Sequence, residues 1–578
     1  MDSVDRHALK MKSDPATDRG LRQTFAAIGA WPSTASGRIL SLVLAFLLVN
    51  GLLLAPRWAA PGMVPALWVA LESLAIVVVF ACLPRRWCSL SLALGVALVV
   101  VATALVGLGD ATARMSLSRP LNLYLDAQLL SAVFNLLTGT MGGGVAFLAG
   151  LAAIVLPLGV VAVLGHLLAP PKRVRPVVHG WRSGLVAAAA LGIVAAGVLA
   201  SDRMRSGVGL PAVRLVGEQT RFFAALQEER ESFAAELVER TEGLTTTPGI
   251  FDRLQGRDVL LAFVESYGMT ALDDPRYAPL IRPRLVELES RLSAAGLQMV
   301  TGSLVAPSQG GQSWLGHASV LSGLWLGNQM RYDLLLASGR TTLVDDFQAA
   351  GYRTVALMPA ITMAWPEGAL FRYDEIYAFK DIGYKGPPLN WVTMPDQFTW
   401  SFLEQSIRDQ DEDARPLFAE IGLISSHAPW TPILPVLDDW ETIGDGSVFE
   451  PWRDAGERPE DLWRDAERVR EHYAMSIDYA LHAMIGYAER FVDDDALLIV
   501  LGDHQPAPLI TGDGVPRTVP VHVISGSQEV LRPFMDWGFQ AGAFPDPDVD
   551  PLGMDYFRPW FVGAFSGDRK ADATLLGP

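Results

Sequence analysis

Cysteine is scarce in this chain of 578 residues: only Cys82 and Cys88 are present, and both lie in the first third. Residues 202–578 contain none, which excludes disulfides, a cysteine metal site and a thiol nucleophile from that part. Positive charge is also in deficit, since 46 Lys and Arg stand against 63 Asp and Glu, a formal net charge of −17. This acidic balance argues against a nucleic-acid-binding protein, which needs a basic face. Charged residues make up 19% and hydrophobic residues 50%, which excludes a disordered chain.

The deficit of positive charge is confined to one part of the chain. Residues 1–201 hold 15 Lys and Arg against 7 Asp and Glu, a net charge of +8. Residues 202–578 hold the remaining 31 basic and 56 acidic residues, a net charge of −25. Two physically different parts therefore share this chain.

The basic part contains five stretches that are long and apolar enough to span roughly 30 Å of hydrocarbon. Glu72 is the only acid within them, and we expect it to face another helix. No cleavable signal peptide is indicated, because the first apolar stretch follows a long polar tail. A further stretch, 121–138, is interrupted by polar residues, and we interpret it as an interfacial or re-entrant helix. The five predicted spans are 38–57, 64–83, 88–109, 143–169 and 181–201.

The distribution of Lys and Arg predicts the orientation of these spans. Basic residues gather in the N-terminal tail, in the loop after the second span and in the loop after the fourth. They fall on one side only if the N-terminus is cytoplasmic and the spans number five, which places residues 202–578 outside the cytoplasm. If 121–138 also crossed, the acidic part would face the cytoplasm, but the basic loop at 172–182 argues against that. We therefore expect a multi-pass protein of the cytoplasmic (inner) membrane with a periplasmic or otherwise extracytoplasmic domain in the cell envelope.

The acidic part is predicted to be one α/β domain on a helical tether. Residues 211–241 have the pattern of an amphipathic helix, and the Thr-Thr-Thr-Pro-Gly run at 245–249 marks a boundary. Short apolar runs then alternate with helical patterns, as in a doubly wound, mostly parallel sheet. The predicted strands are 259–264, 297–304, 354–358, 417–424 and 496–501, and the predicted helices include 285–295, 343–350 and 469–491. The predicted organisation is a cytoplasmic tail at 1–37, a transmembrane region at 38–201, a linker at 202–256 and the α/β domain at 257–578.

Polar residues follow three of these predicted strands: Glu265-Ser266, Ser425-Ser426-His427 and Asp503-His504. In open α/β sheets, sites form beyond the carboxyl ends of the strands, so these groups are expected to converge. Each alone could be a solvated loop residue, but Asp503-His504 directly after a buried run favours function. Glu, Asp and His together suit a divalent cation such as Mn²⁺ or Zn²⁺.

The Gly-rich segment 308–317 predicts a loop followed by the start of a helix. A serine at such a turn, Ser313, presents its hydroxyl beside free backbone N–H groups that can receive an anion. A neighbouring metal would lower the pKa of that hydroxyl and make it a nucleophile. An ordinary N-cap serine is the alternative interpretation.

Taken in order, these segments resemble the alkaline phosphatase/sulfatase superfamily. Within it they are most similar to the membrane-anchored branch of lipoteichoic acid synthases and the phosphoglycerol transferases that modify periplasmic glucans. Members of that branch have N-terminal spans, often five in the synthases, a helical linker and an outer catalytic domain with a sulfatase-like fold. The resemblance covers the whole layout and, at the level of motifs, residues 258–525.

The resemblance implies a role for individual residues. Val-Glu-Ser at 264–266 and Gly-Asp-His at 502–504 imply Glu265, Asp503 and His504 as ligands of one metal, with Ser313 beside them as nucleophile and ligand. Ser-His-Ala-Pro at 426–429 implies that His427 binds the phosphate, and Trp391 before Pro395-Asp396-Gln397 implies a contact with the glycerophosphate group. Other matching segments are Ser-Val-Leu-Ser-Gly at 319–323, Tyr-Asp-Glu-Ile-Tyr at 373–377 and Thr-Val-Pro-Val at 518–521.

The chain also departs from the family pattern. Lipoteichoic acid synthases use a threonine nucleophile, whereas here it is serine, with Ser308 as a weaker rival. The family's basic phosphate contacts have only Arg340 and Arg353 as candidates. Ser313 lacks the following x-Pro-x-Arg of sulfatases, which argues against sulfate-ester hydrolysis. His317, four residues after Ser313, is a candidate for substrate binding or for simple packing.

The expected function is a metal-dependent transferase that moves a phospholipid head-group phosphate ester, such as phosphoglycerol, to a glycan or lipid acceptor through a phospho-serine. The expected cofactor is one divalent cation, Mn²⁺, with Zn²⁺ or Mg²⁺ as alternatives. One alternative function is a phosphodiesterase or phosphatase with the same site, and another is a catalytically silent membrane scaffold. The Trp-rich stretch 429–463 is expected to be a surface insertion, with a lid as the alternative.

Overall fold

The computed structural model describes residues 35–59, 67–83, 89–127, 143–169, 207–239, 249–409 and 415–567, with isolated positions between 130 and 192. The chain divides into two units, one built from Met1–Thr112, Leu121–Leu123 and Gly143–Phe222, the other from Ala113–Pro120, Tyr124–Gly142 and Phe223–Pro578. Most of four predicted segments lies outside the described residues: the tail at 1–37, the span at 181–201, the stretch 121–138 and the boundary at 245–249.

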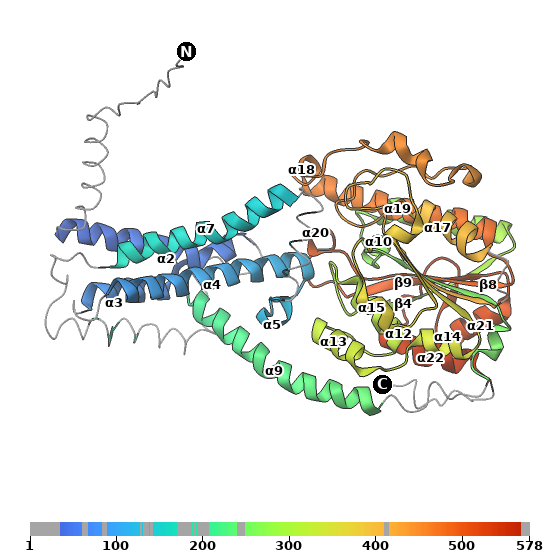
Figure 1. Cartoon of the computed structure of the whole chain (residues 1–578), viewed down its shortest axis with the longest axis horizontal. Coiled ribbons are helices and arrows are strands. Elements are labelled where there is room, and N and C mark those ends of the chain that lie inside the picture. The colour runs from blue at the N-terminus through green and yellow to red at the C-terminus, as the bar shows by residue number, and fades with distance from the viewer. Residues whose placement is uncertain are drawn as a thin grey trace, which may run out of the picture. The chain divides into compact units, whose positions relative to one another are not determined.

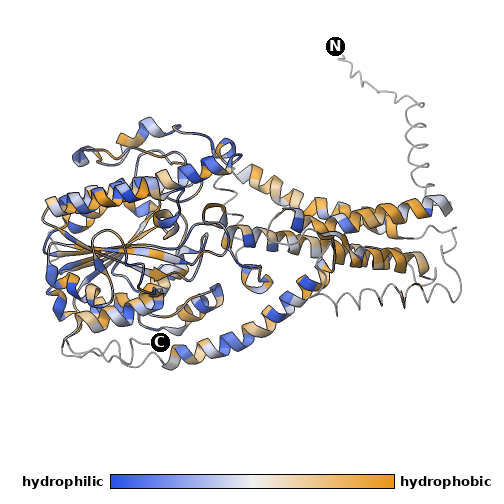
Figure 2. Ribbon diagram, turned by 180° about the vertical axis from the view of Figure 1, so that it is seen from behind, coloured by the Kyte–Doolittle hydropathy of each residue, from blue (hydrophilic) through white to orange (hydrophobic). Residues whose placement is uncertain are grey.

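The first unit is built from long apolar helices (Figure 1). Three helices in the described part of the chain are long and apolar enough to cross a membrane: α2 (Ala35–Ala59), α4 (Leu90–Leu117) and α7 (Gly143–Leu168). Figure 2 shows that hydrophobic residues cover nearly their whole length. The predictions at 38–57, 88–109 and 143–169 therefore correspond to helices of the expected kind, and these helices indicate membrane anchoring.

The predicted span at 64–83 is wrong in its length. The structure has a short strand, β1 (Leu67–Ala70), which pairs with β2 (Gly207–Gly209), and then α3 (Leu71–Cys82). A helix of 12 residues covers only about 18 Å at 1.5 Å per residue, short of the roughly 30 Å of a bilayer core. The Glu72 carboxylate accepts hydrogen bonds from the backbone N–H groups of Ala212 and Val213 at the start of α9 (Pro211–Glu239), so it does face another helix.

The described ends of these helices agree with the predicted alternation of direction. The Arg38 guanidinium, near the start of α2, donates to the carbonyls of Phe80 in α3 and of Leu167 and Leu168 at the end of α7. The start of α2 therefore lies beside the ends of α3 and α7, as expected for helices that alternate in direction. These bonds also satisfy carbonyls that a helix C-terminus leaves without partners.

The second unit is a mixed sheet with helices on both faces (Figure 1). The strand order in the described sheet is β10-β4-β9-β8-β3-β7-β5-β6, with β11 pairing β4. Five neighbours, β8, β3, β7, β5 and β6, are parallel, whereas β9 is antiparallel to both β8 and β4. The expectation of a mostly parallel sheet thus holds for the central strands and not for the β4–β9 side. The strands are β3 (Asp258–Val264), β4 (Gln298–Val305), β5 (Arg353–Met358), β6 (Glu375–Ala378), β7 (Leu417–Leu423), β8 (Ala496–Gly502), β9 (Thr518–Ser525), β10 (Gln540–Ala541) and β11 (Leu552–Gly553).

The central strands are buried on both faces because successive side chains point to opposite sides of the sheet. Leu260, Ala262 and Val264 of β3 pack into one hydrophobic core, and the alternate residues Val259, Leu261 and Phe263 pack into another. The first core is covered mainly by α11 (Ala278–Ala294), α17 (Asp396–Phe402) and α19 (Ala466–Phe491). The second is covered mainly by α12 (Ser313–Ser322), α13 (Gln329–Ser338), α14 (Leu343–Ala349), α21 (Gln528–Asp536) and α22 (Phe557–Phe565).

The Trp-rich stretch 429–463 packs on the second unit through several of its aromatic side chains. Trp440 is buried against Tyr487 and Phe491 of α19. Trp430 is also buried and stacks on Trp463, with ring centroids 5.6 Å apart. This packing agrees with the expected surface insertion.

Candidate active site

Strand pairing brings the first two acids of the site together. β3 pairs with β8 in parallel, with Val264 opposite Gly502, so Glu265 and Asp503 are the next residues of neighbouring strands. On its other side β3 pairs with β7, and the Glu265 amide donates to the Leu423 carbonyl at 3.0 Å. Both carboxylates therefore emerge at the carboxyl edge of the parallel strands, where sites form in such sheets.

Glu265, Asp503 and His504 form a cluster whose ligand atoms all lie within 4.8 Å of one another. His504 Nε2 lies 3.4 Å from Glu265 Oε1 and 3.8 Å from Asp503 Oδ2. His504 Nδ1 lies 2.9 Å from the Gln505 carbonyl, which can only accept, so we assign the proton to Nδ1. Nε2 faces the two carboxylates. Burial disfavours a charged His504, but the Asp503 and Glu265 carboxylates raise its pKa to about 9, and a bound cation would replace the proton on Nε2.

The charges in this cluster favour a bound cation. Burial raises the pKa of Asp503, and repulsion from the Glu265 carboxylate raises it further. Burial also disfavours ionised Glu265, but the nearby His427 and His504 hold the pKa of that carboxyl below its ordinary value. Two carboxylates and an imidazole are a donor set that suits Mn²⁺ or Zn²⁺, so the residues fit the expected metal.

Ser313 is the first residue of α12, and its hydroxyl lies at this cluster. Its Oγ donates to Glu265 Oε2 at 3.1 Å and lies 3.3 Å from His504 Nε2. The preceding Gln312 adopts a left-handed conformation with φ of 64°, which turns the chain sharply into the helix. Ser308 instead donates to the Gln312 carbonyl, so the contacts with the acidic cluster favour Ser313 over its rival.

His427 follows β7, at the same edge of the sheet. Its ring lies 5.9 Å from that of Trp391 between centroids, so these two predicted substrate residues are neighbours. Asp396 fixes the loop before His427, because its Oδ1 accepts from the backbone N–H groups of Ile424 and Ser425 at 2.8 and 2.9 Å. Ser426 Oγ donates to the Glu265 carbonyl at 2.6 Å, which ties this loop to the cluster of Glu265, Asp503 and His504.

The His317 ring is hydrogen-bonded to a buried carboxylate and also packs on an aromatic ring. Its Nδ1 lies 2.8 Å from Glu420 Oε1, and its ring stacks on Phe263 with centroids 3.8 Å apart. Tyr373 donates to the other oxygen of Glu420. Glu420 is 2% exposed and sits within β7, so its charge requires these partners. Sequence reasoning missed Glu420, although it is the single acid in the apolar run 417–424.

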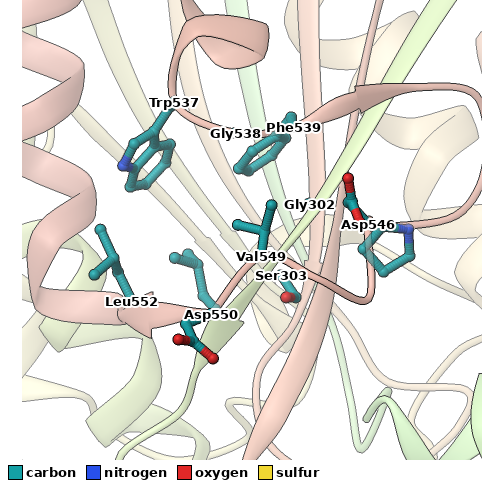
Figure 3. A pocket seen from close by; sticks show the side chains of 11 residues that line it. Gly302, Ser303, Trp537, Gly538, Phe539, Asp546, Val549, Asp550 and Leu552 are labelled. Atoms are coloured by element: carbon teal, nitrogen blue, oxygen red, sulfur yellow. The ribbon is translucent and has the colours of Figure 1, made fainter.

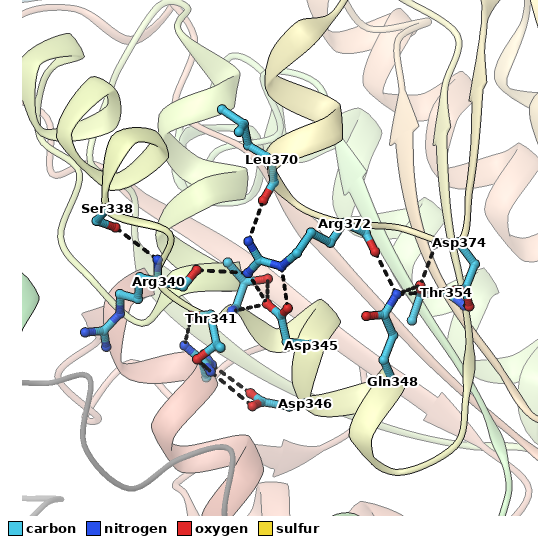
Figure 4. A network of polar contacts seen from close by, with 12 residues as sticks. Ser338, Arg340, Thr341, Asp345, Asp346, Gln348, Thr354, Leu370, Arg372 and Asp374 are labelled. Atoms are coloured by element: carbon cyan, nitrogen blue, oxygen red, sulfur yellow. Dashed lines mark hydrogen bonds and ion pairs between the residues drawn. The ribbon is translucent and has the colours of Figure 1, made fainter.

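The two arginines predicted as phosphate contacts, Arg340 and Arg353, take part in other hydrogen bonds and ion pairs. Arg353 begins β5, at the amino end of the parallel strands, and lies 3.6 Å from Glu375. Because the candidate site lies beyond the carboxyl ends, Arg353 is at the wrong edge of the sheet. Arg340 is buried in a polar network around the start of α14, where Arg372 donates to its carbonyl and its amide donates to Ser338 (Figure 4).

A pocket in the same unit lies apart from these residues (Figure 3). Its lining is mixed: the apolar side chains of Trp537, Phe539, Val549 and Leu552 lie beside polar ones. The polar lining residues are Ser303, Asp546 and Asp550. None of the predicted site residues lines it. The candidate chemistry is therefore at the carboxyl edge of the parallel strands and not in this pocket.

Known proteins resemble parts of this chain in structure but not in sequence. No protein-family model matches the chain, and no curated protein matches it in sequence. The lipoteichoic acid synthase LtaP from Listeria monocytogenes is similar in structure, with 12% identity, a TM-score of 0.36 and coverage of 59% of this chain and 80% of that one. The phosphoglycerol transferase GacH from Streptococcus pyogenes, in complex with sn-glycerol-1-phosphate, has 12% identity, a TM-score of 0.36 and coverage of 61% and 90%.

A protein of the alkaline phosphatase superfamily from Vibrio parahaemolyticus is similar at 15% identity, with a TM-score of 0.36 and coverage of 60% of this chain and 79% of that one. At such identities the likeness concerns the fold alone.

Proposed function

We propose that this chain is a membrane-anchored, metal-dependent phosphotransferase that acts on a phospholipid head group. The observation that carries the proposal is the position of Ser313, whose hydroxyl lies 3.1 Å from Glu265 and 3.3 Å from His504, two members of a three-residue metal-ligating cluster. A hydroxyl at the start of a helix, beside a cluster of this composition, is the arrangement expected of an activated nucleophile.

Glu265, Asp503 and His504 would hold one divalent cation, with Ser313 Oγ as a further ligand. The expected ion is Mn²⁺, with Zn²⁺ or Mg²⁺ as alternatives. When bound, such a cation lowers the pKa of a neighbouring hydroxyl and stabilises negative charge on phosphate oxygens.

In the proposed first step Ser313 Oγ attacks the phosphorus of a phosphodiester such as that of phosphatidylglycerol. The hydroxyl proton leaves toward Glu265 Oε2, the acceptor that it contacts. The Oγ–P bond forms, the bond from phosphorus to the glycerol oxygen of diacylglycerol breaks, and His427 protonates that leaving oxygen. Backbone N–H groups of the first turn of α12 are placed to receive a phosphate oxygen.

In the second step a hydroxyl of a glycan or lipid acceptor attacks phospho-Ser313, and the Ser313 oxygen leaves. Trp391 and His427, whose rings are neighbours, are the proposed contacts for the glycerophosphate group. His317, oriented by Glu420, is the proposed second imidazole near the phosphate. The apolar helices would keep the catalytic unit at the bilayer that contains the donor, on its extracytoplasmic face.

Diacylglycerol release from phosphatidylglycerol vesicles with Mn²⁺ tests this proposal in the purified full-length protein. We expect release by the wild type, none by Asp503→Ala, and wild-type release by the matched control Asp461→Ala, which alters an exposed ion pair. Product analysis separates the two enzymatic functions: an acceptor ester supports transfer, whereas free glycerophosphate without an acceptor product supports hydrolysis. Absence of release from the wild type, with Mn²⁺ bound, would support the silent scaffold.

A further inference from the structure

Residues Ala113–Pro120, which include the last turn of α4, belong to the second unit, the one that contains Ser313. They lie against the loop that leads to Ser313. A Cβ atom on Gly310 would lie 1.8 Å from the carbonyl oxygen of Ser116, so the two backbones approach too closely for any side chain. Gly310 also has φ of +73°, which favours glycine. The neighbouring Gly311 places its Cβ position 3.7 Å from the Leu117 side chain. The loop is therefore fitted to the end of α4.

Arg119 continues this contact with side-chain hydrogen bonds. Its guanidinium makes two bonds to the Asp126 carboxylate, at 2.7 and 3.1 Å, the geometry of a bidentate pair. The same guanidinium donates to Gln312 Oε1 at 3.4 Å. Asp126 ends α5 (Leu123–Asp126), and its neighbour Leu125 is buried against Leu226 and Met330. A fixed carboxylate thus orients Arg119, and Arg119 in turn reaches Gln312.

Gln312 is the residue whose conformation aims the nucleophile. It precedes Ser313 directly, and its left-handed backbone is unfavourable for a residue with a side chain. A relaxed backbone at Gln312 would redirect Ser313 Oγ away from Glu265 and His504. A hydrogen bond that holds the Gln312 side chain opposes that relaxation.

A second arginine holds the other end of the same loop. Arg517, just before β9, donates to the Pro307 carbonyl at 2.8 Å, and its own carbonyl accepts from the Ala306 amide at 2.8 Å. Burial lowers the pKa of Arg517, and the nearby positive charge of Arg119 lowers it further. Two neighbouring guanidinium groups therefore bracket residues 307–312.

We propose that Arg119 is a positioning residue that acts on Ser313 through Gln312. This inference rests on the proposed function, since the direction of the Ser313 hydroxyl matters only if it is the nucleophile. It assigns Arg119 and Asp126, which come shortly after the candidate membrane-spanning helix α4, to the catalytic machinery. These residues, which belong to the same unit as Ser313, would then complete the active site.

A double-mutant cycle in the full-length protein tests this inference. Diacylglycerol release with phosphatidylglycerol vesicles and Mn²⁺ gives kcat and KM for Arg119→Ala, Gln312→Ala and the double variant, and Mn²⁺ affinity is measured for each. We expect Arg119→Ala to lower kcat about 10- to 100-fold, as for a misaligned nucleophile, with KM and Mn²⁺ affinity within about twofold of wild type. The double variant should be no slower than Gln312→Ala, because Arg119 acts through that side chain.

Two further variants complete the design. Gln312→Glu keeps an acceptor for Arg119 and should retain a kcat within about threefold of the wild type. Addition of Arg119→Ala to this variant should remove that retained activity. Arg458→Ala, which removes an exposed arginine, should match the wild type. Wild-type kcat in Arg119→Ala, multiplicative losses in the double variant, or an equal loss of Mn²⁺ affinity would overturn the positioning role. Absence of release from the wild type itself would instead overturn the proposed function, and the positioning role with it.

Discussion

Hydrogen bonds from backbone groups orient the site residues, in addition to the contacts that these residues make with one another. Asp503 Oδ1 accepts from the amides of Ser266 and His504 at 2.8 and 2.7 Å, which leaves Oδ2 toward the His504 ring. Ser266 has a left-handed backbone with φ of 58°, and Gln312 does the same on the nucleophile side. Conformations of this kind persist where the surrounding structure imposes them, and they are frequent at functional sites.

Sequence reasoning reached the residues of the site that follow strands, and it missed those that depend on distant contacts. Glu265, His427, Asp503 and His504 could be predicted to meet because parallel strands end at one edge of a sheet. Arg119 could not, since 193 positions separate it from Gln312 and no local pattern links them. Arg340 and Arg353 were chosen by residue type alone, and type says nothing about which edge of the sheet a residue occupies.

His522 gives a residue-scale prediction on pH. Thr301 donates to the Gly542 carbonyl, so its oxygen accepts from His522 Nδ1, and His522 Nε2 accepts from Tyr267. Burial lowers the pKa of His522 to about 4. The unfolded chain binds this proton near pH 6.5 and the folded chain only near pH 4, so stability falls as pH drops between those values. The loss should approach about 3 kcal/mol at pH 4.

Urea unfolding followed by tryptophan fluorescence checks this prediction between pH 7 and pH 4.5. The comparison is with His522→Gln, which has no proton to gain. We expect the wild type to lose stability more steeply with falling pH than the variant, by up to about 1.4 kcal/mol per pH unit. Equal slopes for the two proteins would show that His522 does not contribute.

At the scale of elements, sheet register explains why the site exists. β3 lies between β7 and β8, and all three end at the same level, with Val264 opposite both Leu423 and Gly502. The five long strands predicted from apolar runs are present, because buried parallel strands produce such runs. The short strands β6, β10 and β11 were not predicted, since two to four residues carry no distinctive pattern. The eight-residue strand β9, which contains Pro520, was not predicted as a strand either, because proline is untypical of a strand interior. The span at 64–83 failed because apolar composition does not specify helix length.

The docking of α22 on α14 gives a prediction for stability. Arg558 and Asp346 form a fully buried ion pair, with hydrogen bonds of 2.7 and 3.0 Å. Asp346→Ala leaves the guanidinium buried without its carboxylate and should lower the free energy of unfolding by about 3–5 kcal/mol. The exposed pair Arg458–Asp461 offers a matched control, since Asp461→Ala should cost about 0.5 kcal/mol or less. Urea unfolding measures both, and a loss below about 1 kcal/mol for Asp346→Ala would contradict the assignment.

At the scale of the molecule, the opposite net charges of the two parts of the chain predict the topology. The net charge of −17 combines +8 on residues 1–201 with −25 on residues 202–578. We therefore expect the N-terminal tail and the acidic unit to lie on opposite sides of the membrane. In a variant without Cys82 and Cys88, Asp461→Cys should react with a membrane-impermeant maleimide in right-side-out vesicles, and Ser13→Cys only after permeabilisation. Reaction of both on the same side would contradict the predicted topology, which requires residues 64–83 to cross although α3 itself covers only about 18 Å.

The acidic charge of the catalytic unit also makes its cation central. In the proposed reaction an anionic phosphodiester would approach a domain with little bulk positive charge, and a metal held by Glu265, Asp503 and His504 would supply the compensating charge. The central claim is that Ser313, beside that cluster, receives the phosphoryl group.

Intact-mass spectrometry of the full-length protein after incubation with phosphatidylglycerol and Mn²⁺ measures this directly. The account predicts an adduct with the mass of a phosphoglycerol ester on the wild type, lost on removal of Mn²⁺ with a chelator and absent from Ser313→Ala. An adduct of equal yield on Ser313→Ala would contradict it. So would a wild type that releases diacylglycerol but shows no adduct when the reaction is quenched within a single turnover.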